Sequence, residues 1–163
     1  MMRSVIIAGL LLTAAAGAAL ADDSKFSDAD FNFDHVSCTG APNQIRIIVT
    51  GLEQSVGLVT VELFPNKQDG FLRGRNRLKR IRFAAHAPET KICMDAPEPG
   101  LFAIAAYHDQ NANMRFDKNA IGLPAEPWGL SNNPKVRLAP PPIEKTLFEV
   151  TPENGAHIVI KLN

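Results

Sequence analysis

The sequence is poor in the residue types that define several specialised protein classes. Its 163 residues include two cysteines, one tryptophan and one tyrosine, and 17 basic residues balance 17 acidic ones. Two cysteines are too few for a disulfide-dense miniprotein. The balanced charge argues against nucleic acid as the main partner, because nucleic-acid-binding domains carry a basic excess. With 45% hydrophobic and 21% charged residues, the composition is that of one ordinary globular domain.

The chain also lacks a helical stripe and the short motifs of common enzyme classes. No stretch of a dozen residues has apolar side chains at convincing helical spacing. The serine-hydrolase, zinc-protease, P-loop and dinucleotide-binding motifs do not occur in the context that each requires. The four histidines are scattered without metal-ligand spacing, at His35, His86, His108 and His157.

The N-terminus has the pattern of a secretory signal peptide. Arg3 supplies a basic start, Val5–Leu12 is almost purely apolar, and Ala19–Ala21 forms an A-x-A cleavage site. Cleavage would remove residues 1–21 and leave no transmembrane segment, since the acidic pair Asp22–Asp23 follows instead of a basic stop-transfer flank. Loss of Arg3 leaves 17 − 1 = 16 basic residues against 17 acidic ones. We therefore expect a near-neutral exported protein, either periplasmic or extracellular.

Export changes the interpretation of the two cysteines. Cys38 and Cys93 are the only pair available, and an oxidising compartment permits a disulfide between them. Their spacing fits neither a CxxC redox motif nor a zinc site. A disulfide closing a loop of about 56 residues would stabilise the fold by roughly 3–4 kcal/mol. The alternative is two buried free thiols.

Period-2 alternation, β-branched residues and intervening turn residues predict about seven short strands. The predicted strands are Gln44–Leu52, Leu58–Phe64, Arg77–Ala85, Lys91–Asp95, Leu101–His108, Thr146–Val150 and His157–Leu162. Leu101–His108 is apolar on both faces, which suits a central strand, whereas Leu58–Phe64 has one apolar face. We therefore expect residues 44–163 to form a single all-β sandwich of immunoglobulin-like or transthyretin-like type, preceded by an acidic arm at 22–43.

The loop after Leu101–His108 has the ligand spacing of a calcium loop. Its positions 1, 3, 5 and 9 carry the side-chain oxygens of Asp109, Asn111, Asn113 and Asp117. Met114 replaces the usual glycine at position 6, and position 12 lacks the usual glutamate. Two interpretations stay open: a weak, millimolar calcium site, or a turn in which these side chains bond their own backbone.

A long loop, Lys118–Ile143, follows and contains six prolines and the only tryptophan. The prolines predict an ordered path. Candidate residues for a polar ligand, such as a glycan stacking on the indole, are Glu126, Trp128, Asn132 and Asn133. Trp128 could instead close the end of the sandwich as part of its core, and Glu126 is placed to add a carboxylate to the Asp109 loop.

The segment Arg73–Arg82 holds six basic residues and no acidic one. It could contact anionic glycans or phospholipid headgroups outside the inner membrane. Alternatively, its charges protect an edge strand against aggregation, or the acidic arm neutralises them.

The only catalytic combination that the sequence offers is His108 with Asp109 and Glu126, which could hold a metal ion or move a proton. The main hypothesis is an exported, non-catalytic module with a binding or structural role in the cell envelope, and metal-assisted hydrolysis is the alternative. The expected partner is an envelope component or a polar small molecule, and calcium is the one candidate cofactor. The sequence does not predict an oligomeric state.

Three segments resemble a bacterial family called domain of unknown function 2141. They are the strand Gly100–Ile104, the run His108–Asp117 with its His-Asp-x-Asn-x-Asn pattern, and Gly122–Asn133 with its Gly-x-Pro-x-Glu-Pro-aromatic-Gly-x-Ser-Asn pattern. Met114 departs from that family's glycine. The resemblance extends over about Gln44–Leu162 and implies an exported β-sandwich domain, but no known reaction.

Overall fold

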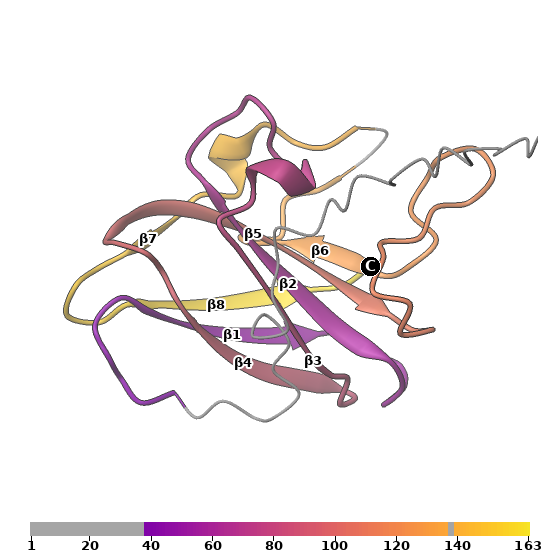
Figure 1. The fold of residues 1–163 in the computed structure, drawn as a ribbon, viewed down its shortest axis with the longest axis horizontal. Coiled ribbons are helices and arrows are strands. Elements are labelled where there is room, and N and C mark those ends of the chain that lie inside the picture. The colour runs from indigo at the N-terminus through magenta and orange to yellow at the C-terminus, as the bar shows by residue number, and fades with distance from the viewer. Residues whose placement is uncertain (1–37, 137–138) are drawn as a thin grey trace, which may run out of the picture.

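The computed structural model describes residues 38–136 and 139–163, which form two packed β-sheets (Figure 1). The three-stranded sheet has the order β4-β1-β8, and the five-stranded sheet has the order β3-β2-β5-β6, with β7 paired to β5. The strands are β1 (Gln44–Thr50), β2 (Leu58–Pro65), β3 (Lys79–Ala84), β4 (Glu89–Asp95), β5 (Gly100–Asp109), β6 (Trp128–Leu130), β7 (Phe148–Val150) and β8 (Ala156–Lys161). Two 3-10 turns, η2 (Gly74–Asn76) and η3 (Ile143–Lys145), lie between them. The predicted all-β sandwich is confirmed.

The predicted signal peptide, residues 1–21, lies outside the described residues, as do residues 22–37 of the predicted acidic arm. The rest of the arm, residues 38–43, leads into β1.

Strand β1 forms the centre of the three-stranded sheet and follows the alternation predicted for it. It pairs antiparallel with β4 and parallel with β8. Ile45, Ile47 and Val49 are fully buried, whereas Arg46 between them is exposed. Because successive strand residues point to opposite faces, this sheet packs one face on the core and presents the other outward.

The five-stranded sheet is different, because its central strands β2 and β5 are buried on both faces. Inward-facing side chains such as Val61 and Ile104 belong to the main hydrophobic core between the sheets. Outward-facing side chains are buried too: Thr60 is 0% exposed and Phe64 is 1% exposed. The sequence predicted this double burial for β5 but only one apolar face for β2.

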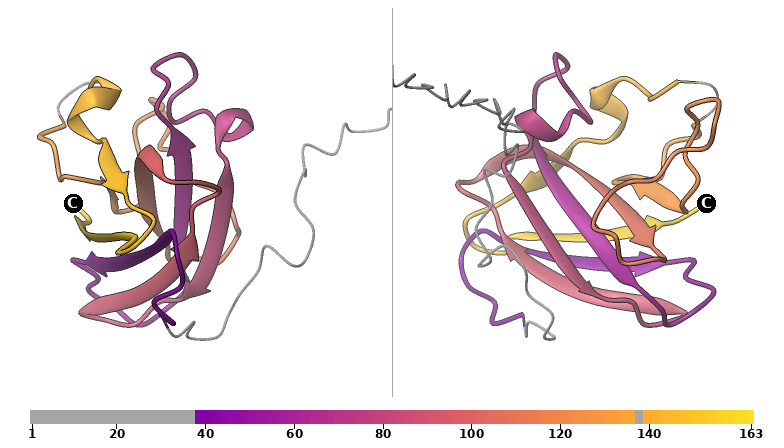
Figure 2. Two further views of the ribbon diagram at one scale, coloured as in Figure 1. Left: turned by 90° about the vertical axis from the view of Figure 1, so that its left-hand side faces the viewer. Right: turned by 45° about the vertical axis from the view of Figure 1, so that its right-hand side comes forward.

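Two parts of the chain cover the outer face of the five-stranded sheet. Residues 66–78 and 139–147 gather at one end of the molecule, at the top in Figures 1 and 2, around a small second core. That core consists of Phe64, Ala103 and Ile143, with Phe71, Leu72, Ala105 and Leu147 packed against it. At the other end, Phe116 from the loop after β5 packs on Tyr107, with ring centroids 5.0 Å apart.

One prediction about Lys118–Ile143 needs correction. The segment is not strand-free, because β6 pairs with β5 inside it, with Trp128 opposite Tyr107, and an isolated bridge joins Lys118 to Pro124. The sandwich therefore has eight strands where about seven were expected. A three-residue strand is too short to produce a period-2 signal, so its pairing depends on the neighbouring strand rather than on its own sequence.

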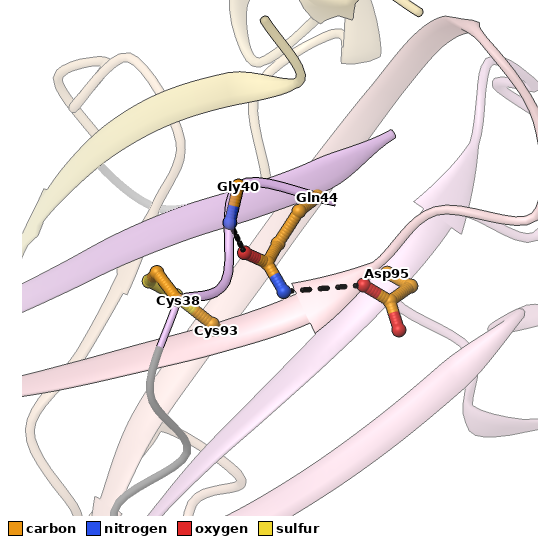
Figure 3. Close-up of a disulfide and its surroundings, with 5 residues drawn as sticks. All are labelled: Cys38, Gly40, Gln44, Cys93 and Asp95. Atoms are coloured by element: carbon orange, nitrogen blue, oxygen red, sulfur yellow. Dashed lines mark hydrogen bonds between the residues drawn. A yellow bond between two sulfur atoms is a disulfide. The ribbon is translucent and has the colours of Figure 1, made fainter. Parts of the chain in front are cut away.

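A disulfide attaches the segment before β1 to the outer face of the three-stranded sheet (Figure 3). It joins Cys38 to Cys93 of β4, with a Cα–Cα distance of 5.6 Å and a sequence separation of 55. Gln44 supports the same turn: its side-chain oxygen accepts a hydrogen bond from the Gly40 N–H at 3.0 Å, and its amide donates to Asp95 at 3.5 Å. The predicted pairing is confirmed, and such a bond is typical of proteins outside the reducing cytoplasm.

A membrane-spanning helix is absent from residues 38–136 and 139–163, where no helix has the length and apolar character to cross a bilayer.

Candidate functional site

The Asp109 loop, residues 109–117, is organised around a carboxylate at the end of β5. Asp109 is 0% exposed. One of its carboxylate oxygens accepts a hydrogen bond from the Asn113 N–H at 3.1 Å, and the other accepts from the Met114 N–H at 2.7 Å. Gly57 makes this packing possible, because a Cβ atom there would overlap the Asp109 carbonyl oxygen. The carboxylate thus closes the loop by binding two of its backbone donors.

The two loop asparagines link this backbone to Asp117. The Oδ1 atoms of Asn111 and Asn113 accept hydrogen bonds from the backbone N–H groups two residues further on, at 3.0 and 2.8 Å. Their side-chain amides both donate to one oxygen of Asp117, at 2.8 and 2.9 Å. The structure therefore brings together all four predicted metal-ligand residues, and their hydrogen bonds are those of the turn interpretation.

Met114 occupies the position where a calcium loop has glycine, and its φ of 65° is left-handed. Glycine is the usual residue there because it reaches this region without steric cost. The departure from the pattern at Met114 therefore leaves the sharp turn in place. In the part of the chain that the structure describes, there is no group of three or more histidine, cysteine or acidic side chains that could hold a metal ion.

Glu126 joins the loop from the segment that returns toward β6. It is 7% exposed, and one of its carboxylate oxygens accepts a hydrogen bond from the Asp117 N–H at 3.1 Å. Burial raises the pKa of Glu126, and the charges of Asp109 and Asp117 add to that effect, while the Asp117 N–H opposes it. The predicted reach of Glu126 to the loop is thus present, in the form of a backbone contact.

His108 and Asp109 do not converge, although they are neighbours in the sequence. They are successive residues of β5, so their side chains point to opposite faces of the sheet. His108 is 1% exposed, and its Nε2 atom lies 2.6 Å from the Val56 carbonyl oxygen. His108, Asp109 and Glu126 are therefore all buried and in contact with backbone groups, and this geometry offers the hydrolase alternative no support.

The predicted ligand residues beyond Glu126 are spread over the end of the sandwich. Trp128 is half-buried in β6, and its ring lies edge-on to Phe116 at 6.3 Å between centroids. The amide of Asn132 donates to the Leu147 carbonyl at 2.7 Å. Asn133 donates to the Val159 carbonyl at 2.8 Å and accepts from the Lys161 N–H at 2.7 Å. Both asparagines thus connect the turn after β6 to other parts of the fold.

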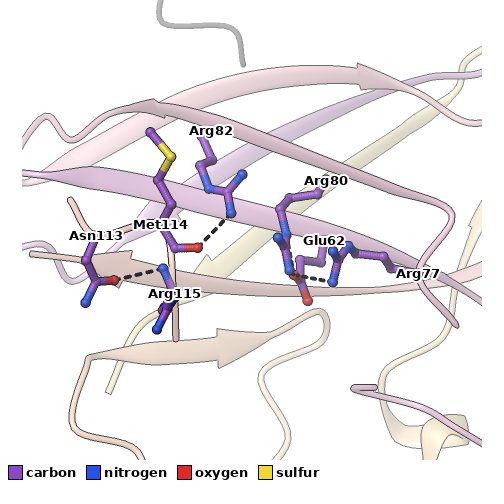
Figure 4. Close-up of polar contacts among 7 residues, drawn as sticks. All are labelled: Glu62, Arg77, Arg80, Arg82, Asn113, Met114 and Arg115. Atoms are coloured by element: carbon purple, nitrogen blue, oxygen red, sulfur yellow. Dashed lines mark hydrogen bonds and ion pairs between the residues drawn. The ribbon is translucent and has the colours of Figure 1, made fainter. Parts of the chain in front are cut away.

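The sequence did not reveal that an arginine supports the Asp109 loop from β3 (Figure 4). Arg82 is 3% exposed, and its guanidinium donates to the Met114 carbonyl at 2.9 Å. Beside it, Arg77 and Arg80 approach Glu62 of β2. The sequence pattern does place the two arginines together: Arg80 and Arg82 alternate with the apolar residues Ile81 and Phe83, so both arginines lie on one face of the strand.

The comparisons with known proteins identify the family. A family model described as an uncharacterized protein conserved in bacteria (DUF2141) matches residues 47–157, which are 111 of the 163 residues. The chain belongs to this family, as the resemblance of its sequence suggested. Searches of the curated proteins and of the solved structures found no match.

Proposed function

We propose that this family member is exported from the bacterial cytoplasm and acts in the cell envelope as a non-catalytic binding or structural module. Two features support export: the signal-peptide pattern of residues 1–21 and the disulfide between Cys38 and Cys93. The burial of His108 and Asp109 supports a role other than catalysis.

The working part of the module is the Asp109 loop, which binds calcium weakly. The observation that carries this proposal is the combination of oxygen ligand spacing with a left-handed Met114 at position 6. A cation would replace the two amide donors of Asn111 and Asn113 at the Asp117 carboxylate. Because only Asp109 and Asp117 bring full charge at ligand positions, the affinity would fall in the millimolar range of extracellular modules.

Calorimetric titration of the mature protein with Ca²⁺ and with Zn²⁺, combined with thermal melts, tests the proposal. Millimolar Ca²⁺ should raise the melting temperature of the wild type, since a ligand that binds only the folded state stabilises it. The variant Asp117→Asn should lose this response, because it removes one of the two charged ligands. The control Glu153→Gln removes one charge from an exposed turn and should keep the response.

A flat calcium response in the wild type would remove the cation from the proposal and leave a loop held only by its own hydrogen bonds. Tight Zn²⁺ binding that depends on His108 would instead favour the hydrolase alternative, because histidine is a zinc ligand and calcium prefers oxygen.

A further inference from the structure

The chain that follows the Asp109 loop forms a short hairpin, the apolar tip, which comprises residues 118–125. An isolated bridge between Lys118 and Pro124 closes this hairpin. It belongs to the connection between β5 and β6, which projects from the end of the sandwich at the right of Figure 1. We propose that the apolar tip inserts into the surface of a bilayer that contains anionic phospholipid.

The large apolar side chains of the tip face water. Ile121 is 79% exposed, the highest value among the large apolar side chains that the structure describes, and Leu123 is 46% exposed. A Cβ atom on Gly122 would meet no atom within 4 Å apart from its two chain neighbours. A single exposed apolar residue is ordinary. Here two of them flank one glycine on a turn that stands clear of the rest of the described chain.

Four backbone donors of the tip have partners within the tip itself. The Asn119 N–H donates to the Leu123 carbonyl at 2.8 Å, and the Gly122 N–H donates back to the Asn119 carbonyl at 2.9 Å. The side-chain oxygen of Asn119 accepts from the N–H groups of Ile121 and Leu123, at 3.1 and 3.0 Å. Backbone donors that leave water without another partner cost free energy, most of all in lipid. The turn can therefore enter the membrane interface with these donors already bonded.

The charge of the tip suits an anionic surface. Lys118 is the one charged residue between Asp117 and Glu126 in the sequence, and it is exposed. The two flanking carboxylates are held inside the loop, because Asp117 accepts two asparagine amides and Glu126 is buried. A lysine beside inserted apolar side chains extends its ammonium group to the lipid headgroups, and an anionic bilayer attracts it.

A bilayer fits this surface better than a protein partner does. A stable protein interface buries about 800 Å² on each partner and takes roughly 20–30 residues a side. The tip offers only residues 118–125. Binding to a membrane interface instead grows with the apolar area that enters it and with attraction to anionic lipid, so a few side chains give weak, reversible binding.

The inference rests on the proposed export, because an exported bacterial protein has membrane surfaces within reach. It does not rest on the proposed calcium site, since Ile121 and Leu123 lie outside residues 109–117.

Cosedimentation of the mature protein with vesicles, at low ionic strength and with chelator present, tests the inference. Vesicles of phosphatidylglycerol mixed with phosphatidylcholine should bind the protein, and vesicles of phosphatidylcholine alone should bind it several times more weakly. Ile121→Ser and Leu123→Ser should each weaken binding about tenfold, the effect of losing one inserted apolar side chain. Leu101→Ser is the matched control, because Leu101 is also 46% exposed but lies at the opposite end of β5.

Two further variants separate the contributions of charge and insertion. Lys118→Gln should weaken binding to the anionic vesicles severalfold, whereas Lys67→Gln, at another exposed lysine, should leave it unchanged. Ile121→Trp should strengthen binding severalfold, because tryptophan prefers the membrane interface. Thermal melts without vesicles show that each variant is folded.

Weaker binding in Ile121→Ser and Leu123→Ser, with binding kept in Leu101→Ser, supports insertion of the tip. Equal losses in Leu123→Ser and Leu101→Ser would overturn it, as would no binding to either kind of vesicle or no gain in Ile121→Trp. Self-association that the tip variants abolish, without vesicle binding, would assign the tip to a protein contact and also overturn the proposal.

Failure of the proposed function would be seen separately. Intact mass of the protein recovered from cells shows whether residues 1–21 are removed, and a calcium titration shows whether the Asp109 loop binds the cation. Neither result alters the vesicle binding of the purified mature protein in chelator.

Discussion

Segments of the chain are attached to the outer faces of the two sheets in different ways. On the three-stranded sheet, the chain before β1 is attached by one covalent bond between residues 55 positions apart. On the five-stranded sheet, the Asp109 loop is held by several short-range hydrogen bonds, among them those of Asp109 to Asn113 and Met114. One longer-range contact, from Arg82 of β3 to Met114, is added to these.

This difference bears on where the chemistry lies. A disulfide needs no polar group to hold a segment, whereas attachment by side-chain hydrogen bonds gathers carboxylates, amides and arginines in one place. The candidate calcium loop and the arginines Arg80 and Arg82 of β3 both lie on the five-stranded sheet, and Arg82 contacts the loop.

The largest expected effect is that of removing the disulfide. Cys38→Ser should lower the free energy of unfolding by about 3–4 kcal/mol, because the unfolded chain regains the entropy of the open loop. Cys38 is chosen because it is exposed, so the serine buries no polar group, whereas Cys93 is 4% exposed. Urea denaturation measures the change. Reductant should bring the wild type to the same midpoint and leave the variant unaffected. An unchanged midpoint in the variant would show that the stability of the fold does not depend on the disulfide.

The disulfide and the Asp109 loop were each predicted in part from the sequence, for different reasons. The disulfide followed from counting, because Cys38 and Cys93 are the only pair in a chain with an export signal pattern. The Asp109 loop followed from spacing, because its hydrogen bonds connect residues two to six positions apart and therefore leave a local pattern of oxygen-bearing side chains. Hydrogen bonds between residues close in the sequence can therefore be predicted from the residue pattern.

The contacts that depend on tertiary structure were not visible. Arg82 reaches Met114 across 32 positions, and nothing in either segment predicts the other. Double burial of β2 also depends on remote segments, since Phe64 is covered by Phe71 and by Ile143. Conversely, two residues that are adjacent in the sequence do not act together. His108 and Asp109 were grouped as one candidate site, but as successive residues of β5 they point to opposite faces of the sheet.

The next largest effect is expected from the hydrogen bonds that hold the Asp109 loop. Asp109→Ala should lower the free energy of unfolding by about 1–3 kcal/mol, because it leaves the N–H groups of Asn113 and Met114 without their acceptor. Thermal and urea denaturation in the presence of a chelator measure the change. Asn119→Ala is the control, since Asn119 makes the same kind of bond to Ile121 and Leu123 but is exposed. Equal effects in both variants would contradict a special role for the buried carboxylate.

A smaller effect is expected where the end of β6 is joined to β8. Asn133→Ala removes the two hydrogen bonds to Val159 and Lys161 and should cost about 1–2 kcal/mol. Asn133 has a φ of 48°, so Asn133→Gly separates loss of the bonds from backbone strain. If Asn133→Ala melts like the wild type, the side chain has no structural role, and the predicted ligand role gains support.

The smallest effect concerns pH and the junction of Glu126 with the Asp109 loop. Burial raises the pKa of Glu126 in the folded state above its ordinary value of 4.5. The folded protein therefore holds this proton more tightly than the unfolded chain, and the stability that results is complete at low pH. It is lost as pH rises from about 4.5 through the folded-state value.

Glu126→Gln has no proton to lose, so its free energy of unfolding should fall less than that of the wild type between pH 4 and pH 7. At pH 7 the variant should be at least as stable, because Asp109 and Asp117 no longer face a third negative charge. Urea denaturation at several pH values, with chelator present, measures the difference, and Glu153→Gln controls for removal of an exposed charge. If the wild type and Glu126→Gln follow the same pH profile, Glu126 is not kept from water by the loop. The hydrogen-bonded loop would then leave this part of the five-stranded sheet open to water.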